Sequence, residues 1–368
     1  MNLSTIEKVN VSGKRVFVRA DLDVPLSETR DSQHETRKIE DETRLRAVMP
    51  TIEYLLGHRA KVIVGGHLGR PEGFDKSLSL EPVAKWLSIK YKVLSIKYGK
   101  RGEFDGWEIT PDLFILENLR FYKGEEANDL NFAKKLSSLA DVYVNDAFAM
   151  SHRNHASIVG ITKFLPHYAG FHLAKEIEML GKAMDNPKRP LVVIIGGKKI
   201  ETKLPLVHRM HEIADYVLVG GKIAQESKVL LKEQHSKLTG KKSVLLVADS
   251  NSDKSDITEQ DAENFLQIIN TARTVIWNGS MGIISEKRKV KSEKNDTERG
   301  TRLIAKGIME SGAYSVVGGG DTVEFLNKLG ILDKFSFTST GGGAMLAFLS
   351  GEKLPGIEAL LNNGLYHA

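Results

Sequence analysis

Gly318-Gly319-Gly320-Asp321-Thr322 lies between two apolar segments of different periodicity. Residues 314–317 form a short apolar run typical of a buried strand, whereas residues 323–329 have the apolar spacing of a helix. Glycines at such a turn let backbone N–H groups and the positive helix N-terminus face a phosphate. The carboxylate of Asp321 would repel a phosphate, so we interpret it as a Mg²⁺ ligand. The alternative is an ordinary tight turn with Asp321 or Thr322 as the helix cap.

The same alternation of strand-like runs and helical stretches extends over the whole chain of 368 residues. This α/β pattern predicts two Rossmann-like, doubly wound parallel-sheet domains, in which ligands bind beyond the carboxyl ends of the strands. The expected strands are residues 15–19, 61–64, 113–116 and 142–144 in the first half, and 191–195, 216–219, 244–247, 274–277, 314–317 and 335–338 in the second. Helical spacing lies between them, for example at residues 46–56, 130–139 and 262–269.

The expected domains are residues 1–171 and 187–353, joined by a helix within 172–186 and separated by a cleft. Asn186-Pro187-Lys188-Arg189-Pro190 ends the joining helix before the next strand. Two polar stretches, 27–42 and 286–299, are predicted to be solvated loops.

Composition excludes some classes of function. The net charge of +5 is a mild excess that suits a small anionic substrate, and without a basic arm we expect no nucleic-acid partner. The chain has no cysteine, which excludes disulfides, thiol catalysis and cysteine-ligated metals. The apolar strings are too short to span a bilayer and the start has no signal-peptide pattern, so we expect a cytoplasmic protein without a membrane partner.

In the first half, cationic side chains follow several expected strands or precede a helix: Arg44, His67, Arg70, Arg120 and Arg153. Carboxyl ends of parallel strands meet at one edge, and arginines cluster where a planar oxyanion is held by bidentate hydrogen bonds. A single arginine of this kind is more often part of a surface ion pair. Asp21 and Asp23 would repel an anion, so we assign them to a substrate hydroxyl or to orienting an arginine.

The second half has further glycine-rich strand ends. Gly196-Gly197 precedes Lys199 and Lys203, whose spacing of four puts both ammonium groups on one face of a helix. This pattern indicates an anion site, and the alternative is an exposed basic turn. Other such ends are Gly220-Gly221, Asn278-Gly279 and Gly341-Gly342-Gly343. Neither a Walker A sequence nor a clean GxGxxG occurs.

As a set, these residues closely resemble the phosphoglycerate kinase family over nearly the whole chain. The resemblance is carried by residues 19–25, 67–71, 117–121, 145–148, 152–153, 277–279, 318–322, 339–344 and 354–356. It implies 3-phosphoglycerate on the N-terminal lobe, Mg-nucleotide on the C-terminal lobe, and a tail, residues 354–368, packed back on the first lobe. The implied reaction is reversible phosphoryl transfer from 1,3-bisphosphoglycerate to ADP in glycolysis, by a monomer whose hinge closes before in-line transfer.

The resemblance also implies a role for each matching residue. The phosphoglycerate would be held by Asp21, Asp23, Arg44, His67, Arg70, Arg120 and Arg153. The nucleotide would be held by Gly197, Lys199, Lys203, Gly221, Asn278, Gly318, Gly319, Gly320, Asp321, Thr322 and Gly341, with Asp321 as the ligand of Mg²⁺. Positive charge around the transferring group would come from the catalytic set Arg44, Lys199 and the Gly320 amide.

The chain departs from the family pattern at Asp23, Lys198, Ser280 and Ser285, and residues 222–254 form a short segment. Two other functions are weighed against the kinase. An NAD-dependent dehydrogenase would need a GxGxxG after a strand with an acidic residue about 20 positions on, and no convincing pair is present. A catalytically idle nucleotide-binding scaffold is favoured by Ser285 and the short segment, and disfavoured by Arg44, Lys199 and Asp321.

Overall fold

The computed structural model describes residues 3–31, 34–224, 227–228, 243–284 and 296–361. The chain forms two compact units, one of residues 1–176 with 353–368 and the other of residues 177–352. The long helix α5 (Phe171–Met184) contains the point of division, which lies inside the predicted joining segment 172–186.

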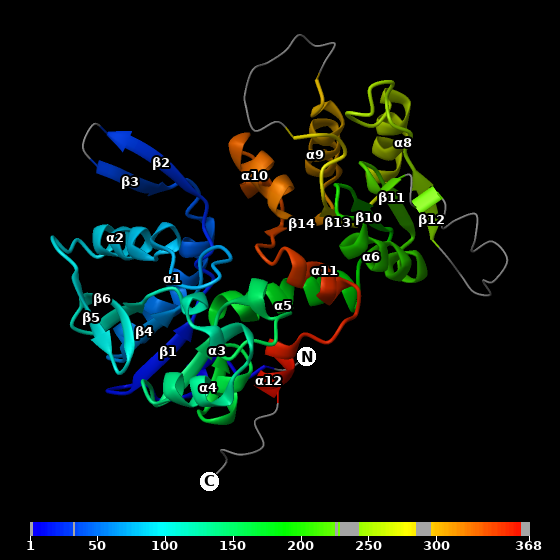
Figure 1. Ribbon diagram of the computed structural model, residues 1–368. Helices are drawn as coiled ribbons and strands as arrows, with labels where there is room; N and C mark the ends of the chain where they lie inside the picture. The colour runs from blue at the N-terminus through cyan, green and yellow to red at the C-terminus, as the bar shows by residue number, and fades with distance from the viewer. Residues whose placement is uncertain (1–2, 32–33, 225–226, 229–242, 285–295, 362–368) are drawn as a thin grey trace. The chain divides into compact units, whose positions relative to one another are not determined.

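The first unit is built on a seven-stranded sheet of order β5-β6-β7-β4-β1-β8-β9 (Figure 1). The predicted strands are confirmed as β1 (Arg15–Arg19), β4 (Lys61–Gly65), β7 (Leu113–Leu116) and β8 (Val142–Asn145), which pair in parallel. Three further strands were not predicted: β5 (Lys97–Arg101), β6 (Phe104–Thr110) and β9 (His167–Ala169). β5 and β6 pair in an antiparallel way, with β5 at the edge of the sheet and β6 between β5 and β7. β5 has no buried residue and so lacks an apolar signal.

Helices cover both faces of this sheet. α1 (Thr43–Gly57) and α2 (Glu81–Lys90) bury their apolar stripes in one core with Val16, Val18 and Val64. α3 (Lys123–Glu126) and α4 (Leu130–Ser137) lie on the other face, where Phe132 of α4 meets Phe104 edge-on. This covering of both faces leaves the strand ends as the place where polar side chains gather.

The prediction of a solvated loop at residues 27–42 is wrong. β2 (Leu26–Asp31) and β3 (His34–Ile39) form an antiparallel hairpin with its own two-stranded sheet. Leu26 and Ile39 face each other at its base and pack against the first core, whereas the strands are otherwise polar and give no apolar alternation. The other predicted loop, 286–299, lies outside the described residues apart from its last four.

The second unit is built on a six-stranded, wholly parallel sheet of order β12-β11-β10-β13-β14-β15. The predicted strands are confirmed, with β15 starting later than expected, as β10 (Leu191–Ile195), β11 (Tyr216–Val219), β12 (Val244–Val247), β13 (Thr274–Asn278), β14 (Tyr314–Gly318) and β15 (Phe337–Thr338). α8 (Glu259–Ile269), α9 (Arg299–Ser311) and α10 (Gly320–Lys328) share one core with them, while α6 (Ile200–Ile213) packs on α11 (Gly343–Leu349).

The last described helix, α12 (Pro355–Leu361), belongs to the first unit. The Gly356 N–H donates to the Ser151 carbonyl at 2.8 Å, and a side chain at this glycine would lie 2.7 Å from Ile158. Residues 362–368 of the predicted tail lie outside the described residues.

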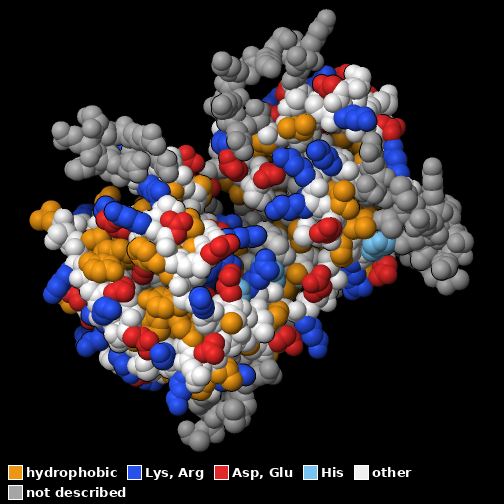
Figure 2. Space-filling model, in the orientation of Figure 1, with side chains coloured by type: hydrophobic (Ala, Val, Ile, Leu, Met, Phe, Trp, Pro, Cys, Tyr) orange, Lys and Arg blue, Asp and Glu red, His pale blue; other side chains and the backbone are white. Residues whose placement is uncertain are grey.

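Short 3₁₀ turns link these elements at Ile6–Lys8, Lys76–Leu78, Leu119–Phe121, Phe148–Met150, Gly160–Lys163 and Leu332–Lys334. Within the described part of the chain, no helix combines the length and the apolarity that crossing a membrane requires. Figure 2 shows basic and acidic side chains interspersed on the visible face of each unit, as expected from the small net charge.

Candidate active site

The carboxyl ends of the central strands of the first unit meet at one edge of the sheet. Arg19, the last residue of β1, pairs with Gly65 of β4 and with Asn145 of β8. The predicted substrate residues that follow these strands therefore start from neighbouring points of one edge.

Arg44 and the two aspartates after β1 form one ionic group. Arg44 Nη1 lies 3.2 Å from Asp21 Oδ2 and 3.8 Å from Asp23 Oδ2. Burial raises the pKa of Asp21, and the positive charge of Arg44 opposes that rise. Asp23 is fixed further because its Oδ1 accepts from the Gly69 N–H at 2.8 Å. The sequence left two roles open for these aspartates, binding a substrate hydroxyl or orienting an arginine. Their contacts with Arg44 are those of the second role.

His67 is buried against a second arginine. Its Nδ1 lies 3.1 Å from Nη2 of Arg19, and its Nε2 lies 3.9 Å from Asp23 Oδ2. Burial lowers the pKa of His67 well below its usual value, and the charge of Arg19 lowers it further. His67 is therefore a neutral imidazole at pH 7, which can bind an anion through one ring N–H but not through a positive charge.

The other arginines differ in how they are held. Arg120 donates from Nη1 to the Gly69 carbonyl at 2.6 Å and pairs through Nε with Glu126 at 2.9 Å. Arg70 and Arg153 are exposed and form no ion pair with any residue that the structure describes. Both nevertheless belong to the group. The charge of Arg70 helps to lower the pKa of Arg120, and the charge of Arg153 helps to lower the pKa of His155. Mutually repelling cations at one edge are suited to an anionic ligand.

Three buried residues of this cluster had no role assigned from the sequence: Arg19, Glu125 and His155. Arg19 and Glu125 are fully buried, and His155 is nearly so. Burial, with the charges of Arg19 and Arg120, lowers the pKa of His155 to about 3. The sequence contained a partial indication of two of these residues. Arg19 begins the motif of residues 19–25, and His155 lies two residues after Arg153.

Lys203 holds two strand ends of the second unit together. Its Nζ donates to the Gly196 carbonyl and, at 3.3 Å, to the Asn278 carbonyl. Burial lowers the pKa of Lys203 to about 8, the charge of Asp321 opposes this shift, and that of Lys199 adds to it. Lys199 and Asp321 therefore lie near enough to Lys203 for their charges to act on it, and Lys199 is exposed.

The glycines around Lys203 allow its close approach. A Cβ at Gly279, whose φ is 100°, would lie 2.1 Å from the Lys203 Nζ. A Cβ at Gly221 would lie 2.7 Å from the Gly197 amide nitrogen, so these two turns touch. Gly341 belongs to a separate turn, where its N–H donates to Ser339 Oγ at 3.1 Å before α11.

The turn at residues 318–322 is confirmed as the end of a strand followed by a helix. Gly318 ends β14, Gly319 has a φ of 96°, and α10 begins at Gly320. The alternative of a cap formed by Asp321 or Thr322 is wrong, because Gly319 is the N-cap and no side chain caps this described helix. The backbone N–H groups of the first turn are thus left for another acceptor.

Two buried polar atoms beside this turn have no hydrogen-bond partner among the described residues: Thr322 Oγ1 and Asn278 Oδ1. Asp321, in the first turn of α10, is exposed. Within the described part of the chain, no group of three or more acidic, histidine or cysteine side chains could hold a metal. Mg²⁺ commonly needs one or two carboxylates together with phosphates and water, so the residues here fit a nucleotide-bound Mg²⁺.

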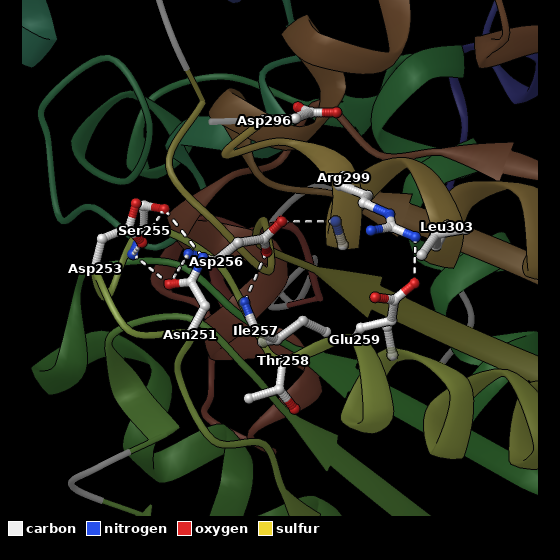
Figure 3. A pocket seen from close by; sticks show the side chains of 12 residues that line it. Asn251, Asp253, Ser255, Asp256, Ile257, Thr258, Glu259, Asp296, Arg299 and Leu303 are labelled. Carbon is white, nitrogen blue, oxygen red and sulfur yellow. Dashed lines mark hydrogen bonds and ion pairs between the residues drawn. The ribbon is translucent and has the colours of Figure 1, made fainter. Parts of the chain in front are cut away.

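A cavity of about 190 Å³ also lies in the second unit, between the segment 251–258 and the start of α9 (Figure 3). Asp256 accepts there from the Ile257 and Gly300 N–H groups at 2.8 and 2.7 Å. None of the predicted site residues lines this cavity. Ser285 and Glu286 lie outside the described residues, as do residues 225–226 and 229–242 of the short segment 222–254.

Taken together, an arginine-rich strand edge in one unit and glycine-lysine helix starts in the other define a two-domain α/β protein of the phosphoryl-transfer class. The sequence model of the family described as phosphoglycerate kinase matches residues 6–244 and 226–352. The chain belongs to the phosphoglycerate kinase family, and it is an enzyme, a kinase.

Individual relatives agree with this membership. The phosphoglycerate kinase of Dictyoglomus turgidum is 38% identical over 400 residues, covering 95% of this chain and 96% of that protein. The structure of the enzyme from Coxiella burnetii is similar with a TM-score of 0.78 and 29% identity, over 98% of this chain and 99% of its own. The structure of the enzyme from Pyrococcus horikoshii OT3 gives a TM-score of 0.76 and 30% identity at the same coverage of both chains.

Proposed function

We propose that the chain transfers a phosphoryl group reversibly between 1,3-bisphosphoglycerate and ADP, giving 3-phosphoglycerate and ATP. The observation that carries the proposal is the presence of both half-sites on one chain of this family: the Arg44 cluster in one unit, and Lys203 with the 318–322 turn in the other. Arginines suit the carboxylate and phosphate of the first substrate, and helix-start amides suit a polyphosphate.

The reaction in the direction of ATP use needs little proton transfer. The acceptor is a carboxylate, which is ionised at neutral pH because its pKa lies near 4. The protein therefore needs to place positive charge around the transferring group rather than to supply a general base. Arg44, oriented by Asp21 and Asp23, and Lys199 at the start of α6 would supply this charge, with amides at Gly318–Gly320.

Mg²⁺ would be held by Asp321 together with the nucleotide phosphates. When bound, it neutralises charge on the β- and γ-phosphates. Thr322 Oγ1 and Asn278 Oδ1 have no partner among the described residues. The Thr322 hydroxyl would donate to the polyphosphate, and Asn278 Oδ1 would accept from water bound to it.

A coupled assay of ATP-dependent phosphorylation of 3-phosphoglycerate tests the function. We expect turnover that is lost with EDTA and restored by Mg²⁺, and an Asp321→Asn variant that needs far more Mg²⁺ for half-maximal rate. Glu324→Gln, an exposed carboxylate of the same helix paired with Lys328, is the matched control. Absence of turnover in the folded wild-type protein would favour the idle scaffold, and an unchanged Mg²⁺ requirement in Asp321→Asn would remove Asp321 from the metal site.

Because the two half-sites belong to different units, we propose that transfer occurs after the units close on each other. Closure would also exclude water, which would otherwise hydrolyse the acyl phosphate. Small-angle scattering should show a smaller radius of gyration with both substrates than with either alone. An equal radius in all ligand states would contradict closure.

The cytoplasmic location and the monomeric state stay predictions. Sedimentation equilibrium of the purified chain would check the monomeric state. The assignment of residues 1–171 to phosphoglycerate and 187–353 to the nucleotide is part of the proposal, and binding measurements with the variants described here test it.

A further inference from the structure

A buried chain of hydrogen bonds runs behind His67. Arg19, fully buried, donates from Nε to Ser157 Oγ at 2.8 Å, and from its Nη1 to the carbonyl of Ala20. Glu125, also fully buried, lies 2.5 Å from Ser157 Oγ through Oε1 and accepts from the Ser157 N–H through Oε2 at 3.0 Å. The chain therefore leads from a carboxylate on α3, through a serine, to the guanidinium that contacts His67.

The chemistry of arginine fixes which atom donates at each step. A guanidinium has N–H donors and no acceptor, so the Ser157 Oγ accepts from Arg19 and its own hydrogen is directed to Glu125. For the same reason His67 Nδ1, 3.1 Å from Arg19 Nη2, must be an acceptor. A neutral imidazole with an accepting Nδ1 carries its hydrogen on Nε2.

The Nε2–H of His67 is thus turned toward the side of the ring where the aspartates and the arginine cluster lie. Asp23 Oδ2 lies on that side, 3.9 Å from Nε2, which is beyond hydrogen-bond distance. The donor is therefore available for a substrate oxygen. A protonated His67 would place a second N–H against the Arg19 guanidinium, so the contact itself opposes the charged ring.

We propose that Glu125 and Ser157 are positioning residues that, through Arg19, hold His67 as the neutral Nε2–H tautomer and so present one fixed donor to the oxyanion of the substrate. The link to substrate binding rests on the proposed function, whereas the tautomer does not. Burial raises the pKa of Glu125, and the charge of Arg19 and the hydrogen bonds from Ser157 oppose that rise. The direct partners of Arg19 are a serine, a carbonyl and an imidazole.

Imidazole ¹⁵N NMR of the full-length protein gives the first test. His67 is identified by the signal that His67→Gln removes, and in the wild type we expect it as the Nε2–H tautomer. Ser157→Ala should produce a mixture with the Nδ1–H form, and so should Glu125→Gln if that variant folds. Ser157→Thr, which keeps the hydroxyl, should restore the wild-type pattern. A wild-type Nδ1–H form, or an unchanged tautomer in Ser157→Ala, would overturn the proposal.

Steady-state kinetics give the second test. Ser157→Ala should raise KM for 3-phosphoglycerate about tenfold, the loss expected for one well-placed hydrogen bond, with KM for ATP unchanged. Ser137→Ala is the matched control, because Ser137 is a buried serine of the same unit whose hydroxyl donates to the Lys134 carbonyl. An equal rise in both KM values, or an equal effect of the control, would indicate general destabilisation and contradict a positioning role. An inactive wild type with the expected tautomer would refute the proposed function alone.

Discussion

Arg44→Ala is expected to lower kcat by about 10³–10⁵-fold while the Kd for nucleotide stays nearly unchanged, as for arginines that stabilise a transferring phosphoryl group. In the structure Arg44 is held by Asp21 and Asp23, and its side chain keeps about a third of its surface exposed, at 32%. An arginine fixed in this way needs no reorganisation when charge develops, which is why its removal should affect the rate rather than nucleotide binding.

Arg46→Ala is the matched control. Arg46 lies in the same helix and pairs with Glu42 at 2.6 Å, but its side chain is 70% exposed, so this pair contributes little. Its kcat should stay within about twofold of the wild type. If Arg44→Ala behaves in the same way, the assignment of Arg44 is wrong. Because Arg44→Ala leaves the buried Asp21 without its partner, its melting temperature should fall, and the assay is run below it.

Lys203→Met is expected to weaken nucleotide binding by about 10–100-fold at pH 7 and to remove a pH dependence that the wild type shows. The folded-state pKa of about 8 lies below the usual 10.5, so between these values the folded protein binds fewer protons than the unfolded chain. The contribution of Lys203 to stability therefore rises with pH in that window. A polyphosphate favours the ammonium form, so nucleotide affinity falls as pH rises above about 8.

Calorimetric titration with ADP from pH 7 to 9.5 measures this effect. The wild-type Kd should rise about tenfold over the range, whereas the Kd of Lys203→Met should be flat. Lys198→Met is the control, since Lys198 is an exposed lysine of the same turn and should keep the wild-type profile. A flat wild-type profile would mean that Lys203 does not meet the nucleotide and serves the Gly196 and Asn278 carbonyls alone.

The four central strands of the first sheet and the strands of the second could be predicted because parallel strands covered on two faces are nearly continuous apolar runs, as in Leu191–Ile195. The hairpin of β2 and β3 could not, because most of its residues are polar or charged and only its base, Leu26 and Ile39, packs on a core. These two strands are held by pairing with each other rather than by burial. The periodicity of one segment carries no information about such a partner strand.

Among the candidate site residues, the exposed arginines could be found because several follow different strands. Glu125 and Ser157 could not, since nothing local distinguishes a buried glutamate in a short helix from a solvated one. Their importance depends on a contact between residues 138 positions apart, Arg19 and Ser157. The absence of a side-chain cap on the described helix α10, which starts after Gly319, likewise depends on backbone geometry that the sequence does not contain.

The return of α12 to the first unit has a consequence for how the polypeptide is made. Residues 353–368 belong to that unit, although 177–352 lie between them and its remainder. Ile357 and Leu360 are buried there, so a nascent chain still on the ribosome has to leave these contacts open. Synthesis from the N-terminus therefore completes the unit of residues 177–352 first, and the unit that contains residues 1–176 is finished last.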